Sequence, residues 1–123
     1  MDGVEDVFHG GFDMERMIKF KGGATRSVDD GKLDFEGFLS PIVLERYACY
    51  MQKHRKQADG KMRESDNWQN GMCKNRYMKS MFRHFFDVWK IHRGVMAGDM
   101  EDALCALLFN VMGYLFEILK KKS

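Results

Sequence analysis

Apolar residues in the last two thirds of the chain recur at the spacing of α-helices. The first predicted helix spans residues 41–58, "PIVLERYACYMQKHRKQA", and its apolar residues share one face. These residues are Leu44, Tyr47, Ala48 and Met51. Pro41 suits the first helical position, where no amide donor is needed, and Ser40 can cap the helix. The "DG" pair at 59–60 is expected to end it.

Two further helices are predicted. One covers residues 76–93, and Gly94 is placed to end it in a left-handed conformation. Its apolar stripe consists of Met78, Met81, Phe82, Phe85, Val88, Trp89 and His92. The other, "MEDALCALLFNVMGYLFEILKKK", follows Asp99, a good N-cap, and its closing lysines suit the negative end of the helix dipole. Because residues 103–109 are apolar on every side, this helix should be central and buried.

The region before Pro41 has weaker signals. "DMERMIKF" suits a short helix or a strand, and "KGGATRSVDDGKLDFEGFLS" is a glycine-dotted loop with room for one helical turn. No repeat or low-complexity linker divides the chain. We therefore expect one all-α domain, residues 1–123, with an irregular region at 1–35 and a bundle of three main helices. Three helices rich in methionine and phenylalanine should leave apolar surface, so we expect a homo-oligomer to complete the bundle.

Composition narrows the classes of function. Hydrophobic residues make up 45% of the 123, which allows a real core and excludes a disordered chain. The net charge of +2 is too balanced for a protein that wraps duplex nucleic acid by charge alone, so no duplex nucleic acid is expected as partner. The 11 methionines can fill a core or adapt to a partner protein.

Cysteine usage and the start of the chain predict where the protein works. Cys49, Cys73 and Cys105 lie far apart with no CxxC pair, which favours free thiols in a reducing compartment over a disulfide scaffold. No apolar run approaches the ~18 residues of a membrane span, and the acidic start "MDGVEDVF" is no signal peptide. We expect a cytoplasmic protein, in the host cytoplasm if it is viral, with no membrane partner.

The last predicted helix carries a narrow stripe of small and polar residues. The stripe consists of Asp102, Ala106, Asn110, Gly113 and Glu117. In a structural interpretation Asn110 bridges two helices, Gly113 lets a neighbour approach closely, and Asp102 serves as a cap. In a functional interpretation Asp102, with Glu101 or Asp99, offers carboxylates to a divalent metal. The helix dipole already favours acids at this end, so both interpretations stay open.

Polar residues also share the face of the second predicted helix that lies opposite its apolar stripe. They are Lys79, Arg83, His84 and Asp87. His84 and Asp87, three positions apart, can act as a base with its orienting group or as metal ligands. Arg83 can hold a phosphate with its planar fork. The alternative is a solvated face with a helical ion pair.

Basic residues surround the end of the first predicted helix. They are Lys53, His54, Arg55, Lys56, Lys61 and Arg63. The next loop, "RESDNWQNGM", carries Trp68 among small polar residues. Cations followed by an aromatic loop suit a phosphorylated ligand whose base stacks, whereas a charged helix end with a tryptophan lid on the core is the alternative. No Walker loop, GxGxxG, HExxH, zinc cysteine pattern or serine-nucleophile elbow is present.

In their order along the chain these segments resemble the phage dATP/dGTP diphosphohydrolase family (its N-terminal-domain type), a MazG-like group of all-α nucleotide pyrophosphohydrolases. The resemblance runs from about residue 31 to 117 and rests on "GKLDFEGFLSPIVLERYACYM", "RESDNWQNG", "YMKSMFRHFFDVWKIHRG" and "EDALCALLFNVMGYLFE". The family-like elements within them are Arg63 with Asn67, Trp68 and Gly71, then Arg83-His84 with Trp89 and Gly94, then Asn110.

This resemblance implies a helical, usually oligomeric protein that cleaves a purine deoxynucleoside triphosphate to a monophosphate and pyrophosphate, with Mg²⁺ or Mn²⁺ as cofactor. The metal would be held by Asp87, Glu101 and Asp102, with Asp99 as a further candidate. His84 and Asp87 would be catalytic. The nucleotide would be bound by Arg55, Arg63, Asn67, Trp68, Lys79 and Arg83.

The chain departs from the family pattern in its acidic residues. MazG-type enzymes carry an E-x-x-E pair on one helix and an E-x-x-D pair on the next, whereas the first helix here offers only Glu45. The only such pair in the helical part is Asp99-x-x-Asp102. Three functions stay open: a metal-dependent dNTP diphosphohydrolase, an oligomeric protein that sequesters a nucleotide signal without cleaving it, and a helical adaptor whose methionine-rich face meets another protein.

Overall fold

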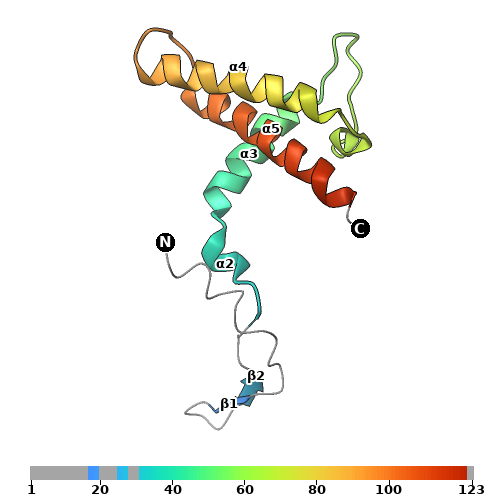
Figure 1. Cartoon of the computed structure of the whole chain (residues 1–123), viewed down its shortest axis with the longest axis vertical. Coiled ribbons are helices and arrows are strands. Elements are labelled where there is room, and N and C mark those ends of the chain that lie inside the picture. Colours follow the sequence, from blue (N-terminus) through green and yellow to red (C-terminus); the bar gives the residue numbers. More distant parts are fainter. Residues whose placement is uncertain (1–16, 20–24, 28–30, 122–123) are drawn as a thin grey trace. The chain divides into compact units, whose positions relative to one another are not determined.

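The computed structural model in Figure 1 describes residues 17–19, 25–27 and 31–121. Contacts divide the chain into two units, residues 1–40 and 41–123. In the first unit, β1 (Met17–Lys19) and β2 (Thr25–Ser27) form an antiparallel pair in which Ile18 lies opposite Arg26. The short helix α2 (Phe35–Phe38) begins after Asp34, whose Oδ1 accepts a hydrogen bond from the Gly37 amide at 2.9 Å.

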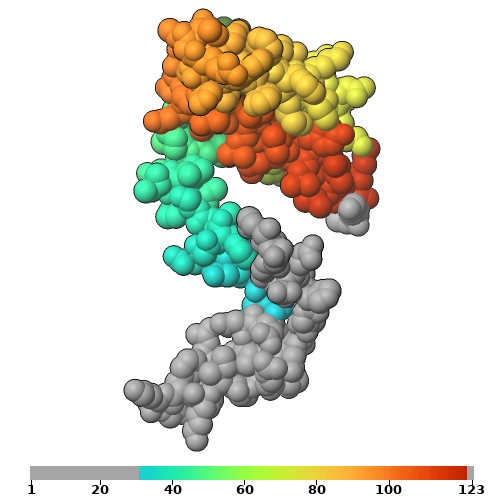
Figure 2. All heavy atoms as spheres, turned by 60° about the vertical axis from the view of Figure 1, so that its left-hand side comes forward, coloured from blue at the N-terminus to red at the C-terminus, as the bar shows by residue number. Residues whose placement is uncertain are grey.

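The second unit is helical. It contains α3 (Pro41–Lys53), the 3₁₀ helix η1 (Asn67–Asn70), α4 (Lys74–His92) and α5 (Met100–Lys120). Helices α4 and α5 lie side by side and antiparallel, and α3 crosses α5 (Figure 1). Figure 2 shows α4 and α5, coloured yellow to red, packed along each other. The prediction of an all-α fold with three main helices is confirmed.

Helix α3 ends five residues before its predicted end, because the chain after it folds back into a small hairpin. The Arg63 amide donates to the Arg55 carbonyl at 2.8 Å, and Lys56 and Met62 form an antiparallel bridge. Gly60, at a φ of 85°, makes the turn of this hairpin. The turn at the "DG" pair was predicted correctly. It closes a hairpin, however, so residues 54–58 belong to the turn and hairpin and not to the helix.

The ends of α4 and α5 agree with the sequence-based expectations. Gly94 follows α4 at a φ of 74°, in the left-handed region. Asp99 caps α5, because its Oδ1 accepts hydrogen bonds from the amides of Glu101 at 2.9 Å and Asp102 at 3.3 Å. The cysteines are free thiols, also as predicted.

The core of the helical unit is the contact between α4 and α5. Tyr77 of α4 is fully buried, and its ring lies directly on Gly113 of α5. A Cβ atom at position 113 would lie 2.4 Å from two ring carbons of Tyr77, so only glycine permits this approach. The predicted role of Gly113 in close approach is therefore confirmed. Asn110 does not bridge helices: its Nδ2 donates to the Ala106 carbonyl of the same helix at 2.8 Å.

The prediction that α5 is buried on every side is wrong. Its buried residues are Cys105, Ala106, Asn110, Gly113 and Glu117, which include most of the small-and-polar stripe. Its opposite side exposes large apolar residues, among them Leu104, Val111, Leu115 and Leu119. By length and composition alone α5 could cross a membrane, contrary to the sequence-based expectation, and 28% of its apolar window is buried. Among residues 31–121, neighbouring elements cover one side of this helix and leave the other exposed.

Candidate functional site

A hollow of about 690 Å³ opens in the helical unit where the end of α3, the loop after it, η1, α4 and α5 meet. Its aromatic lining residues are Tyr47, Tyr50, Trp68 and Phe109. Its charged and imidazole-bearing lining residues are His54, Arg55, Arg63, Glu64 and His84. The hollow therefore combines flat aromatic groups with two guanidinium groups and a single carboxylate.

The hairpin after α3 sets the two arginines of the hollow beside each other. The Arg63 amide donates to the Arg55 carbonyl, and the Arg55 Nε donates to the Arg63 carbonyl, both at 2.8 Å. The Arg55 Nη1 also donates a hydrogen bond to Gln52 Oε1 at 3.3 Å. The Arg63 side chain is exposed, and within the described residues its guanidinium forms no hydrogen bond or ion pair. One arginine is thus fixed and its neighbour is available to an anion.

Trp68 lies on η1 and is half-buried. Its ring packs edge-on against Phe116 of α5, with ring centroids 4.9 Å apart. The segment after η1 is tied to the same helix, because the Met72 amide donates to Glu117 Oε1 at 3.2 Å. Trp68 therefore covers part of α5, as the lid interpretation expects, and it also lines the hollow, while base stacking stays a prediction.

Ionisation in and beside the hollow follows from burial and from hydrogen bonds. Burial raises the pKa of Tyr47 to about 12, and it also raises the pKa of Tyr50. Both phenols are protonated at neutral pH and can donate hydrogen bonds. The hydrogen bond from Lys120 lowers the pKa of Glu117, and the Met72 amide adds to this effect against the opposing influence of burial.

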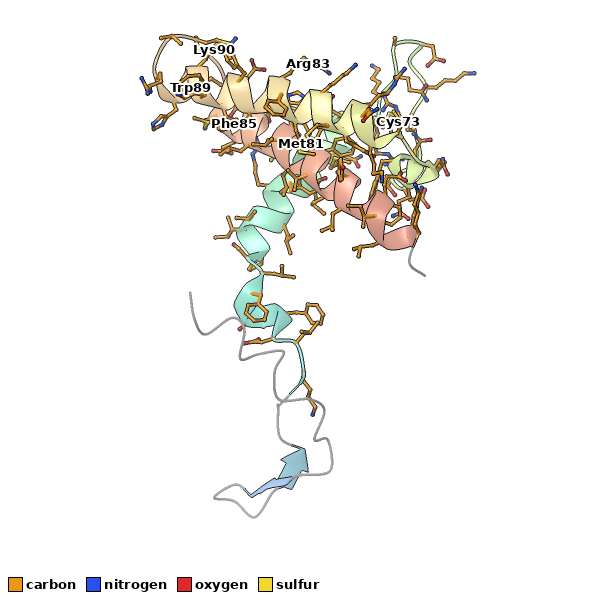
Figure 3. All side chains as sticks on the ribbon, viewed as in Figure 1. Cys73, Met81, Arg83, Phe85, Trp89 and Lys90 are labelled. Carbon is orange, nitrogen blue, oxygen red and sulfur yellow. The ribbon has the colours of Figure 1, made fainter. Side chains whose placement is uncertain are left out.

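The hollow brings together five of the residues predicted to bind or process a nucleotide. They are Arg55, Arg63, Asn67, Trp68 and His84. Lys79, Arg83 and Asp87 do not line it. Arg83 donates to Ser80 Oγ at 2.9 Å and points away from α5 (Figure 3), while Asp87 pairs with Lys90 at 3.5 Å. Predicting one face for all of these α4 residues was wrong for His84, because adjacent residues such as Arg83 and His84 lie about 100° apart around a helix.

Two of the acids predicted to hold a metal, Glu101 and Asp102, form a clamp between α3 and α5 instead. Arg46 of α3 bonds to Glu101 at 2.6 Å and to Asp102 at 2.7 Å, and Lys53 also donates to Asp102. The hydrogen bond from Lys53 has the largest effect in lowering the pKa of Asp102, and the bond from Arg46 adds to it. In the described part of the chain, no three side chains of His, Cys, Asp or Glu gather closely enough to hold a metal ion. The paired carboxylates do not form a donor set that fits Mg²⁺ or Mn²⁺, and that cofactor stays a prediction.

Several residues of the hollow were not foreseen. Tyr47 and Phe109 were assigned to the core, and Tyr50 and Glu64 were given no role. Tyr50 and His54, four positions apart, have ring centroids 4.4 Å from each other, a spacing that the sequence does reveal. Arg46 could not be recognised as the partner of two acids, because that contact joins residues 55 and 56 positions apart.

Comparison of the chain with protein-family models, with curated proteins and with solved structures gave no match. The resemblance drawn from the sequence motifs therefore remains an expectation.

Proposed function

We propose that this protein binds a nucleotide in the hollow, with the phosphates at Arg55 and Arg63 and the base against Trp68. The observation that carries the proposal is that cations and flat aromatic rings line one hollow of about 690 Å³. Pockets of roughly 300–1,000 Å³ are typical of sites for ligands of this size.

The arginine pair supports an anionic ligand. Guanidinium groups bind phosphate oxygens through two parallel hydrogen bonds, which makes arginine the usual residue for this task. Two arginines and a single acid, Glu64, line the hollow, so its formal charge favours an anion. Arg55 is already held by Gln52 and by the Arg63 carbonyl, which reduces the entropy lost when a ligand binds.

Asn110 supports a base that carries an amino group. This residue lines the hollow and is 4% exposed, and its Nδ2 is engaged with the Ala106 carbonyl. That bond assigns the remaining oxygen, Oδ1, as an acceptor, and Oδ1 has no partner among the residues described. An acceptor at this place suits the exocyclic amine of adenine or guanine. We expect dGTP to bind more tightly than dITP, which lacks that amine, and Asn110→Leu to remove the difference.

The acids of the hollow favour binding without cleavage over hydrolysis. Glu64 is the single carboxylate among its lining residues, whereas phosphoryl transfer of the implied kind uses several carboxylates around divalent ions. A protein that sequesters a nucleotide signal needs only the cations and the aromatic wall. Cleavage to a monophosphate and pyrophosphate is the alternative that product analysis decides.

The decisive experiment is a melting-temperature panel with dATP, dGTP, dCTP and dTTP, with and without Mg²⁺, followed by recovery of the ligand after denaturation. A ligand at a hundredfold excess over its Kd stabilises the fold by about 2.7 kcal/mol, which is readily measured. Intact nucleotide supports sequestration, and released pyrophosphate supports hydrolysis. If none of the nucleotides shifts the melting temperature, the adaptor function replaces both.

Matched variants separate the hollow from general charge effects. Arg63→Ala should weaken nucleotide binding by at least ~10-fold, because a charge-assisted bidentate contact is lost. Lys79→Ala removes an equally exposed cation that lies on α4 outside the hollow, and it should leave the affinity unchanged. Equal losses in the two variants would show that the ligand is held by net charge alone.

A further inference from the structure

The outer side of α5 carries a regular apolar seam. We define the seam as Leu104, Leu108, Val111, Leu115 and Leu119, at intervals of four, three, four and four residues. Four of these residues are between 44% and 52% exposed, and Leu108 is half-buried. Alternating intervals of three and four are the pattern by which one helix packs along another. The α4 contact uses the opposite side of α5, through Gly113, so the seam has no partner helix among the described elements.

The exposed area of the seam is large enough to form the centre of a protein–protein interface. With about 200 Å² for a fully exposed side chain of this size, its five residues expose roughly 400 Å². A stable interface buries about 800 Å² on each partner, roughly half of it apolar. The seam thus provides the apolar centre of such an interface, and the polar residues at the two ends of α5 provide its rim.

The seam matches itself when a second copy runs in the opposite direction. Antiparallel pairing about the middle of α5 places Leu104 opposite the partner's Leu119 and Leu108 opposite the partner's Leu115, with Val111 beside the twofold axis. A twofold axis of this kind is the commonest symmetry of soluble oligomers. The first turn of α5 is acidic, with Glu101 and Asp102, and its end is basic, with Lys120 and Lys121. Glu101 and Asp102 are already paired with Arg46 and Lys53, and Lys120 with Glu117, so antiparallel pairing relies on the apolar seam itself.

We propose that this seam joins two copies of the chain through antiparallel pairing of α5 with α5 of a second copy. The exposed aromatic stripe of α4 is the competing surface, with Phe82 70% exposed. Its flanks are mainly basic, through Lys79, Arg83 and Lys90, with Asp87 as the acid among them. Two copies joined there would bring like charges together, whereas the seam consists only of leucine and valine and brings no like charges together.

Light scattering with two matched variants of the full chain tests the choice of surface. The wild-type protein should be a dimer at micromolar concentration. Leu115→Glu should weaken the dimer by roughly 100-fold or more, because pairing would bury two carboxylates in an apolar seam. Phe82→Glu introduces the same charge on the α4 stripe and should leave the dimer intact. Circular dichroism confirms that both variants remain helical.

Cross-linking tests the direction of pairing. In a Cys49→Ser, Cys73→Ser background, which removes the two exposed thiols, Val111→Cys should join to itself through a short bismaleimide. Leu104→Cys should join efficiently only to Leu119→Cys in a mixture of the two proteins. Self-joining of Leu104→Cys would show parallel pairing and overturn the proposal.

The remaining outcomes also overturn it. They are a monomeric wild-type protein, dissociation by Phe82→Glu but not by Leu115→Glu, and a monomer that co-sediments with phosphatidylcholine vesicles through the seam. The last outcome would mean that lipid covers α5. Because the seam residues do not line the hollow, Leu115→Glu should retain nucleotide-induced stabilisation, and failure of either proposal leaves the other testable.

Discussion

The two sides of α5 invert the usual distribution of residues. The side that packs on protein carries Ala106, Asn110, Gly113 and Glu117, while the side that no described helix covers carries leucine and valine. Two factors determine which residues lie on the inner side. Only glycine leaves room for the Tyr77 ring, and hydrogen bonds satisfy the buried polar groups. The comparison teaches that burial in this helix follows complementarity to its neighbours, and that its most apolar side stays exposed among the described residues.

The largest effect on stability is expected at the contact between Gly113 and Tyr77. Gly113→Ala should destabilise the protein by about 2–3 kcal/mol, because the added Cβ would overlap the Tyr77 ring. In an open helix the same change stabilises by up to about 1 kcal/mol, so the sign itself is diagnostic. Urea denaturation measures the difference. Leu115→Ala on the outer side is the control, and in dilute solution it should cost less than about 1 kcal/mol.

A smaller effect is expected from removing the inner charge. Glu117→Gln keeps the shape of a side chain that is 6% exposed, but it weakens the bonds from the Met72 amide and from Lys120. The melting temperature should fall by less than in Gly113→Ala. Because Glu117 ties the segment after η1 to α5, nucleotide binding beside Trp68 should weaken too. An unchanged affinity in Glu117→Gln would show that Phe116 alone holds the lid.

The same acids make stability depend on pH in a defined direction. The pKa values of Glu117 and Asp102 are lowered in the folded protein, by Lys120 and by Lys53 with Arg46 respectively. Their contributions are therefore complete above the unfolded values of about 4, and they are lost as the pH falls through the folded values. Urea midpoints measured from pH 7 to pH 2 should decline below about pH 4. Asp102→Asn should flatten that decline, and a decline of wild-type steepness in this variant would contradict the clamp.

The smallest expected change is at the other partner of the closest contact. The Tyr77 hydroxyl is buried and has no hydrogen-bond partner among the described residues. Tyr77→Phe keeps the ring on Gly113 and removes only that group, so it should leave stability unchanged or raise it by up to about 1 kcal/mol. Calorimetry can detect either result. A marked loss of stability would mean that the hydroxyl has a bonding role.

Local chemistry was readable from the sequence alone. The spacing of apolar residues predicted the three main helices, Asp99 and Gly94 marked helix ends correctly, and Gly113 was identified as a place of close approach. Arg63 and Trp68 were recognised as a cation and an aromatic group near each other, and both line the hollow. These features depend on residues a few positions apart, whose relations the helical period and turn chemistry determine.

Only the tertiary structure decided what each surface faces. The sequence cannot reveal that Arg46 and Lys53 neutralise the acids at the start of α5, or that Arg83 and Asp87 turn away from the hollow. The sequence of a helix that is apolar on almost every side also does not reveal which side will pack against neighbouring elements. Contacts between residues tens of positions apart make these choices, because they depend on how whole helices cross and on which side chains then meet.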